Sequence, residues 1–221
     1  MFLRKIAFLH GKIFLIFKEV MFLQCNQYTI PSNEKITIGM LGGPSSGKDT
    51  LCDYISAILS NSNKKMTEIA RDYIEKNGNL YSPFQERIIF DKIAEREKEV
   101  GATYQVVLSP GARILAYFYT AILTPPNPNS AELDNLQDMF SSCIKAVNDY
   151  DYLFFCESLD YDEDGLRYQS EEENLMLRDC ILNFLKLHKI QYVYLGVGSV
   201  SERSEKVLEV IGAQKVKECA L

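Results

Sequence analysis

The chain has 221 residues, of which 47% are hydrophobic, and a formal net charge of −6. This length is sufficient for the core of one domain, and a negative chain without a basic stripe is not typical of nucleic-acid-binding proteins. The six cysteines form no CxxC pair and the two histidines lie far from any motif, which excludes a zinc finger or a histidine-based triad. Cysteines without such pairing are usually small buried side chains of proteins in a reducing cytoplasm, so we expect a cytoplasmic protein.

Residues 1–33 differ in composition from the rest of the chain. They contain four basic residues against one acid, and apolar bursts such as "IFLIF". No uncharged apolar run there approaches the roughly 20 residues that a membrane span needs, so no integral span is expected. An amphipathic helix for a membrane surface or a partner is one interpretation. We favour the other interpretation, in which residues 1–33 are a dispensable extension or translation begins at Met21. We therefore divide the chain into an extension over 1–33 and one folded domain over 34–221.

A glycine-rich loop follows the first predicted strand. The apolar run over 36–41 predicts a buried strand, and the spacing of Gly42, Gly47 and Lys48 matches the phosphate loop. In that loop backbone N–H groups surround phosphate oxygens and the lysine reaches the β- and γ-phosphates. The sequence therefore predicts ATP as cofactor. The residues expected to bind it are Gly42, Gly43, Pro44, Ser45, Ser46, Gly47, Lys48, Asp49 and Thr50.

The helix predicted over 49–59 directs its positive N-terminal end at this loop. One position departs from the usual motif, because Asp49 stands where Ser or Thr commonly supplies a hydroxyl to magnesium, and Thr50 follows it. Asp49 facing Mg²⁺ or its waters, and Thr50 supplying the hydroxyl, are both compatible with the sequence. We expect Mg²⁺ to be a cofactor together with ATP.

Strands and helices alternate after the loop. Further strands are predicted over 64–70, 104–109, 150–157 and 190–196, and further helices over 71–78, 82–100, 112–123, 130–148, 170–189 and 199–212. Three of these helices begin with capping pairs, namely Ser82 with Gln85, Ser170 with Glu173 and Ser199 with Glu202. The alternation predicts an α/β fold, a nucleotide-kinase-like P-loop NTPase with a parallel five-stranded sheet in a three-layer sandwich.

Ligands of such sheets bind outside the carboxyl ends of the strands, so the residues that follow each strand are candidates. Phosphoryl transfer needs a carboxylate to hold magnesium or to accept a proton, and cations to neutralise the moving phosphoryl group. The candidate acids are Glu68, Glu157 and Asp164, and the candidate cations are Lys48, Arg71 and Arg167. We expect Lys48, Glu68 and Arg167 to be catalytic, with Glu68 as the base.

Five segments resemble, in order and spacing, the P-loop kinases typified by the ribosylnicotinamide kinase domain of NadR proteins, within a broader family of small AAA-like ATPase domains. They are "GGPSSGKDTL", "EIARDYI", "FQERIIFDKIAEREKE", "DGLR" and "ERSEKVLEVI", and the likeness covers about residues 35–212. The resemblance implies that Asp164 and Arg167 belong to a lid over the phosphates. It also implies that Glu68 and Arg71 flank the acceptor, and that Arg203 lies near the nucleotide base.

The chain departs from the family after the third strand, where the family commonly carries an aspartate and this chain has Ser109, Pro110 and Gly111. This difference is compatible with another acceptor, with transfer of the role to Glu68 or Asp49, or with a domain that binds nucleotide without transferring phosphate. The substrate expected is a small nucleoside-like acceptor, because the segment around Arg167 is otherwise acidic and would repel a phosphorylated one.

Other functions fit less well. A regulatory GTPase would need an Asn-Lys-x-Asp element, and Asn63-Lys64 continues with Lys65-Met66. A mechanical AAA ATPase would need a strand that ends in Asp-Glu, whereas here only Glu157 follows the fourth strand. A nucleoside monophosphate kinase, a nucleotide-dependent switch and the AAA-type ATPase remain alternatives. The sequence indicates neither the acceptor nor the oligomeric state.

Overall fold

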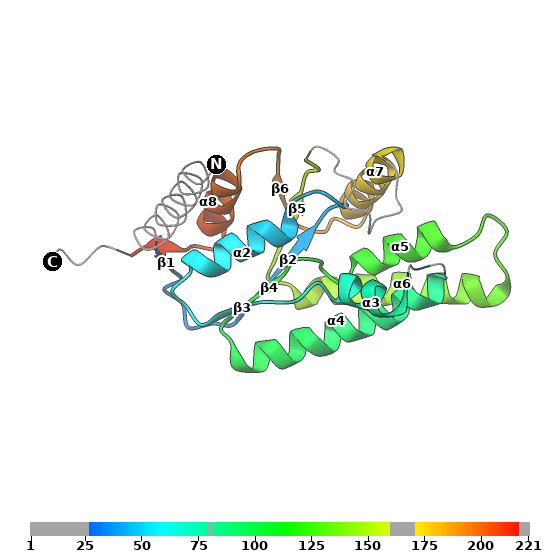
Figure 1. Cartoon of the computed structure of the whole chain (residues 1–221), viewed down its shortest axis with the longest axis horizontal. Coiled ribbons are helices and arrows are strands. Elements are labelled where there is room, and N and C mark those ends of the chain that lie inside the picture. The colour runs from blue at the N-terminus through cyan, green and yellow to red at the C-terminus, as the bar shows by residue number, and fades with distance from the viewer. Residues whose placement is uncertain (1–26, 79, 81, 160–170, 217–221) are drawn as a thin grey trace, which may run out of the picture.

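The structure is a computed structural model and describes residues 27–78, 80, 82–159 and 171–216 (Figure 1). Five parallel strands form the central sheet in the order β3-β4-β2-β5-β6. Their bounds are β2 Ile36–Leu41, β3 Asn63–Lys65, β4 Val106–Ser109, β5 Tyr152–Cys156 and β6 Val193–Leu195. The α/β fold with a parallel five-stranded sheet that the sequence predicts is therefore confirmed.

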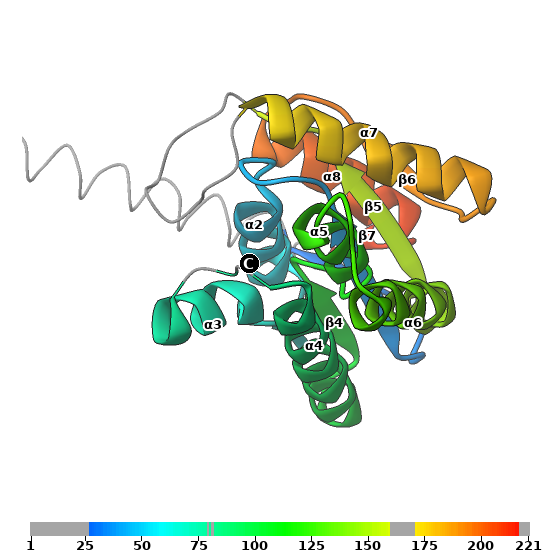
Figure 2. The ribbon, with the colours of Figure 1, turned by 90° about the vertical axis from the view of Figure 1, so that its right-hand side faces the viewer.

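Helices cover both faces of this sheet, which completes the three layers. They are α2 Lys48–Ile58, α3 Ile69–Asn77, α4 Pro83–Thr103, α5 Leu115–Leu123, α6 Ser130–Ala146 with the 3-10 turn η1 Val147–Asp149, α7 Glu171–Leu187 and α8 Val200–Val210. Figures 1 and 2 show α2 and α8 on one face of the sheet, and α5, α6 and α7 on the other.

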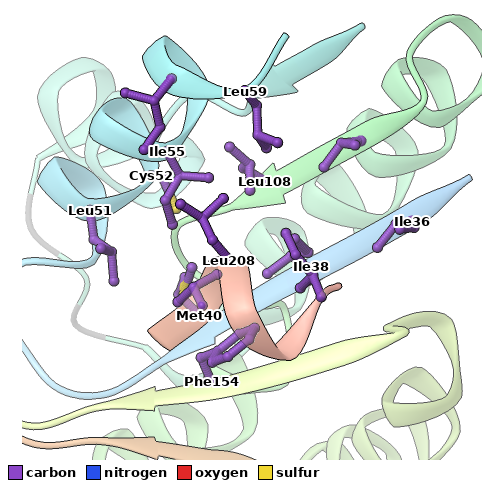
Figure 3. Close-up of a cluster of buried hydrophobic side chains, with 14 of the residues drawn as sticks. Ile36, Ile38, Met40, Leu51, Cys52, Ile55, Leu59, Leu108, Phe154 and Leu208 are labelled. Atoms are coloured by element: carbon purple, nitrogen blue, oxygen red, sulfur yellow. The ribbon is translucent and has the colours of Figure 1, made fainter. Parts of the chain in front are cut away.

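The alternation of side chains along the strands produces these layers. Ile38, Met40 and Phe154 point to one face, where they pack in a buried cluster with side chains from α2 and α8 (Figure 3). Leu41 and Phe155 point to the other face and pack against α5, α6 and α7. The strands are buried on both faces, which explains why they are almost continuously apolar in sequence.

A small second sheet attaches the chain before residue 34 to this domain. Strand β1 (Tyr28–Thr29) pairs antiparallel with β7 (Gln214–Lys215). Ile30 is buried in the core, and its backbone N–H donates to Asn61 Oδ1 at 2.7 Å. Residues 28–30 thus pack with the domain although the predicted boundary falls after residue 33. Residues 1–26, with Met21 and the basic apolar segment, lie outside the described residues.

The second strand is shorter than predicted. The sequence predicts a strand over 64–70, whereas β3 ends at Lys65 and α3 begins at Ile69. The Glu68 carbonyl accepts the first helical hydrogen bond, from the Asp72 N–H at 3.0 Å, so the backbone has already left the sheet. The capping pairs at Ser82 and Ser199 form as predicted; Ser170 lies outside the described residues.

Of the cysteines in the described ranges, Cys52, Cys143 and Cys156 are buried, as predicted, and Cys180 is exposed. Burial raises the pKa of the Cys143 thiol to about 12. No helix in the described part of the chain is long and apolar enough to cross a membrane.

Replacing Ile38 by alanine should lower the free energy of unfolding by about 2–5 kcal/mol, because the fully buried side chain would leave a cavity between β2 and α2. Urea denaturation measures this change. The control is Ile88→Ala, since Ile88 is 43% exposed on α4. Equal stability losses in the two variants would contradict the assigned core.

Candidate functional site

The loop between β2 and α2 is held close to its neighbours. Gly42 has φ 130°, and a Cβ atom there would lie 2.4 Å from the Cys156 carbonyl oxygen. A Cβ at Gly43 would lie 1.9 Å from Asn174 Oδ1. Ser45 also adopts a left-handed backbone, with φ 54°, which is uncommon for a residue other than glycine. The glycines that the sequence motif requires are therefore explained by close packing as well as by backbone conformation.

Helix α2 presents an open N-terminus to this loop. Its N-cap is Gly47, and no side-chain cap hydrogen bond is found there among the described residues, whereas side chains cap α4, α6 and α8. Lys48 extends into the loop, and its Nζ donates to Gly43 O at 2.7 Å and to Ser46 Oγ at 2.9 Å. Uncapped N–H groups beside an ammonium form a site for an anion.

Three contacts from distant segments support the loop. Arg203 is 5% exposed, and its Nη1 donates to Ser46 O at 2.9 Å. The N–H of Leu159 donates to Ser45 O at 3.1 Å. Asn174 Nδ2 donates to Pro44 O at 3.3 Å, and Asn174 is likewise 5% exposed. The loop conformation therefore depends on the chain after β5 and on both following helices.

Of the supporting residues, Arg203 was found from the sequence and Asn174 was not. The contacts of Arg203 place it against the loop and against the Glu157 carbonyl, with Nη2 3.4 Å from Glu157 O. A contact of Arg203 with the nucleotide base stays a prediction. Asn174 carries no motif of its own, and only the close approach to Gly43 identifies it.

Asp49 forms an ion pair on the β3 side of α2. Lys65 Nζ lies 2.7 Å from Asp49 Oδ1 and 2.8 Å from Asp53 Oδ2. Thr50 is exposed. Across the described ranges there is no cluster of three His, Cys, Asp or Glu residues that holds a metal. Mg²⁺ at nucleotide sites takes only one or two protein ligands besides phosphates and water, so Asp49 and Thr50 fit an ion that arrives with the nucleotide.

A pocket of about 190 Å³ opens beside the loop. Lys48 and Pro44 line it on the loop side, and the turn after β4 and one face each of α3, α4 and α5 form its walls. Helices α3 and α4 lie next to each other (Figure 2). The apolar part of the wall includes Ile74, Leu80, Ile89, Ile93 and Leu115. A mostly apolar lining with a few polar groups is typical of small-molecule sites, and Lys48 is one of those polar groups here.

Glu68 and Arg71 lie on the wall of this pocket. They bind each other, with Arg71 Nε 2.7 Å from Glu68 Oε2, and both side chains are about one-third exposed, at 38% for Arg71 and 31% for Glu68. The structure thus brings together Lys48, Glu68 and Arg71, as the sequence predicts from the ends of the first and second strands. Asp164 and Arg167 lie outside the described residues, so their place in a lid stays a prediction.

Ser109 occupies the position after the third strand where an acid was expected from the family. Its hydroxyl donates to Glu97 Oε1 at 3.0 Å. Glu97 also accepts from Tyr150 Oη at 2.6 Å and from Arg113 Nη1 at 2.5 Å, and it is 7% exposed. Burial raises the pKa of Glu97, although these hydrogen bonds oppose the rise. Glu97 is thus fully bound in a buried cluster and does not replace the missing acid.

Glu86 is the second buried acid, and sequence analysis did not single it out. It is 3% exposed and lines the pocket from the first turns of α4. Its carboxyl forms no hydrogen bond or ion pair with any side chain in the part of the chain that the structure describes. Burial alone raises the pKa of Glu86 to about 8. Two sequence signals included Glu86, namely its place in the family-like segment "FQERIIFDKIAEREKE" and its helical spacing from Ile89 and Ile93, but the spacing indicated merely a buried face and neither signal assigned Glu86 a role.

Glu157, the acid after the fourth strand, is bound elsewhere. Arg178 Nε donates to its two carboxylate oxygens at 2.8 and 2.9 Å, and the Tyr194 hydroxyl donates to it as well. Burial opposes the charge of Glu157, but the hydrogen bonds from Arg178 and Tyr194 lower its pKa. A carboxylate held in this way is a poor base for activating water, which disfavours the mechanical ATPase.

Comparison with known proteins gives one family. A family described as an AAA domain matches residues 37–203. No curated protein matches.

Solved structures share the fold at low sequence identity. The crystal structure of NadR protein in complex with NR aligns with a TM-score of 0.65 at 16% identity, over 85% of this chain and 54% of that one. The crystal structure of NadR protein in complex with NAD and AMP-PNP aligns with a TM-score of 0.58 at 15% identity, over 85% of this chain and 52% of that one. Deoxyadenosine kinase from M. mycoides aligns with a TM-score of 0.51 at 13% identity, over 80% of this chain and 98% of that one. The chain spans about half the length of the NadR chains.

Gly43→Ala should destabilise the protein by about 1–3 kcal/mol, because the new methyl group would overlap Asn174 Oδ1. Asn174→Ala removes the obstacle, so the double variant should lose less stability than the sum of the two single variants. A double-mutant cycle of unfolding free energies measures this coupling. Additive losses would contradict the close approach of Asn174 to the loop.

The pH dependence of stability should change in Glu86→Gln. The pKa of Glu86 is about 8 in the folded protein, against an ordinary value of 4.5, so the folded state keeps a proton that the unfolded state releases. The stabilisation by this proton is complete below the ordinary pKa and is lost as pH rises toward 8. Wild type should therefore lose stability relative to Glu86→Gln by up to about 1.4 kcal/mol for each pH unit in this range.

Denaturation of both proteins between about pH 5 and 8 measures that difference. Glu95→Gln on the exposed face of α4 is the matched control and should follow wild type. Parallel pH profiles of wild type and Glu86→Gln would show that Glu86 titrates normally and is not buried as described.

Proposed function

The chain belongs to the family of AAA domains that its residues 37–203 match, and we propose that it is an ATP-dependent kinase that phosphorylates a hydroxyl of a small nucleoside-like acceptor. The observation that carries this proposal is that one pocket is lined both by Lys48 of the phosphate loop and by Glu68 and Arg71. A donor phosphate in the loop and an acceptor in the pocket would then be neighbours. Positioning of this kind supplies most of the catalysis in phosphoryl transfer.

The proposed roles follow from the contacts. The α2 N-terminus and Lys48 bind the β- and γ-phosphates of ATP, and Lys48 exchanges its bonds to Gly43 O and Ser46 Oγ for phosphate oxygens. Asp49 or Thr50 holds Mg²⁺, which neutralises charge on the phosphates when it is bound. An Asp49 ligand would share its carboxylate with Lys65, 2.7 Å away. Arg203 supports the loop, and we keep its contact with the nucleotide base as part of the proposal.

Glu68 is the proposed base for the acceptor hydroxyl, with Arg71 as its partner beside the acceptor. By their resemblance to the family lid, Asp164 and Arg167 would close over the phosphates. The solved structures with similar folds support the reaction class, since one is NadR in complex with NR and another a deoxyadenosine kinase. A cytoplasmic kinase is consistent with the buried thiols of Cys52, Cys143 and Cys156.

The experiment is ADP release from ATP and Mg²⁺, with one panel of nucleosides that includes ribosylnicotinamide and a second panel of mononucleotides. We expect release that depends on a nucleoside. Dependence on a mononucleotide would instead identify a nucleoside monophosphate kinase. ATP binding without acceptor-dependent release from either panel would favour a nucleotide-dependent switch, consistent with Ser109 at the place of the expected acid.

Lys48→Ala should lower acceptor-dependent turnover about 100-fold or more while the circular dichroism spectrum and the thermal midpoint stay near those of wild type. The reason is that the lysine contacts charge that develops on the phosphates. The control is Lys64→Ala, which removes an exposed lysine of β3 and should keep full activity. Normal turnover of Lys48→Ala would contradict the proposed role of the loop in binding the ATP phosphates.

A further inference from the structure

Glu86 presents a carboxyl to a largely apolar pocket. It belongs to the same face of α4 as Ile89 and Ile93, and all three line the pocket. The Glu86 side chain is 3% exposed, whereas the other pocket acids, Glu68 and Glu75, are more accessible. Glu86 is therefore the acid that lies deepest in the wall.

A buried carboxyl is costly unless a partner satisfies it. Buried polar groups in folded proteins are nearly always hydrogen-bonded, and an unpaired group destabilises the folded state. The other buried acid of α4, Glu97, follows this rule through Ser109, Arg113 and Tyr150. Within the described residues Glu86 has no such partner, which points to a partner that enters the pocket with a ligand.

We propose that Glu86 selects the acceptor, because its carboxyl binds a hydroxyl or amine of an unphosphorylated small molecule whose apolar face lies against Ile89 and Ile93. This inference rests on the proposed function, since the molecule bound is the acceptor of that reaction. It makes Glu86 a specificity residue and leaves the proton transfer to Glu68.

The charges of the pocket favour an acceptor without phosphate. Its described acids are Glu68, Glu75 and Glu86, and its described cations are Lys48 and Arg71. Lys48 is assigned to the nucleotide and Arg71 is bound to Glu68 at 2.7 Å. With these two cations already assigned or bound, no lining cation of the described residues is left at the Glu86 end to bind a phosphate on the acceptor. The pocket instead favours a neutral acceptor, or a cationic acceptor that forms an ion pair with the Glu86 carboxylate.

The raised pKa of Glu86, about 8, agrees with this role. Near neutral pH the carboxyl then carries a proton for most of the time, so it can donate a hydrogen bond as well as accept one. Ser109, at the usual place of an acid, has its hydroxyl bound to Glu97. Glu86 thus provides, from α4, an acidic group on the wall of the same pocket.

Calorimetric titration tests the proposal with wild type, Glu86→Gln and the surface control Glu95→Gln. The probes are ribosylnicotinamide as a cation, deoxyadenosine and uridine as neutral nucleosides, AMP and UMP as phosphorylated competitors, and AMP-PNP with Mg²⁺ as the nucleotide. We expect an unphosphorylated probe to bind wild type and Glu95→Gln with equal affinity. Glu86→Gln should bind that probe about 10-fold or more weakly, because the amide can neither become the carboxylate that pairs with a cation nor supply the O–H donor of the protonated carboxyl.

AMP-PNP separates this inference from the proposed function. Its affinity should be the same in all three proteins, which also shows that Glu86→Gln is folded. Equal affinity of wild type and Glu86→Gln for the acceptor probe, binding of AMP or UMP alone, or binding of AMP-PNP with none of the acceptor probes would overturn the role of Glu86. Failure of AMP-PNP to bind wild type would instead overturn the proposed kinase.

Discussion

The buried guanidinium of Arg203 fixes the loop on which the rest of the site depends. It joins the Ser46 carbonyl at 2.9 Å to the Glu157 carbonyl at 3.4 Å, so a residue of the last long helix connects the end of β2 to the end of β5. Asn174 and Leu159 hold the neighbouring carbonyls of Pro44 and Ser45. These contacts bind the carbonyls of Pro44, Ser45 and Ser46, and Lys48 of the same loop lines the neighbouring pocket.

The strand order brings the two halves of the site together. Strand β2 lies between β4 and β5, so the loop after β2 lies next to the turn after β4. That turn forms the pocket wall together with α3, α4 and α5. The same sheet edge thus carries an anion site and a small-molecule pocket, and Lys48 lines both. Two ligands in these places would meet at the lysine, as an in-line transfer of a phosphoryl group requires.

Much of this arrangement follows from local sequence signals, and the rest depends on long-range packing. The phosphate loop, the parallel sheet and the caps at Ser82 and Ser199 were predicted because each is encoded within a few neighbouring residues. The second strand was predicted, but its end was placed at residue 70 and not at Lys65, because the apolar residues after Lys65 belong to the turn and to α3 and not to the sheet. Asn174 and Glu86 were missed because their partners, the loop and the pocket, come from segments distant in sequence. The ion pair of Asp49 with Lys65 was missed for the same reason, because its two residues lie on different elements.

The central claim is that the loop and the pocket are one site for donor and acceptor. A crystal structure of the chain with AMP-PNP and Mg²⁺ tests it most directly. The account predicts the triphosphate in the loop, Lys48 Nζ moved from Gly43 O to a phosphate oxygen, and the γ-phosphate facing the pocket that Glu68 and Glu86 line. A nucleotide bound away from Lys48, or a γ-phosphate turned away from that pocket, would contradict the account.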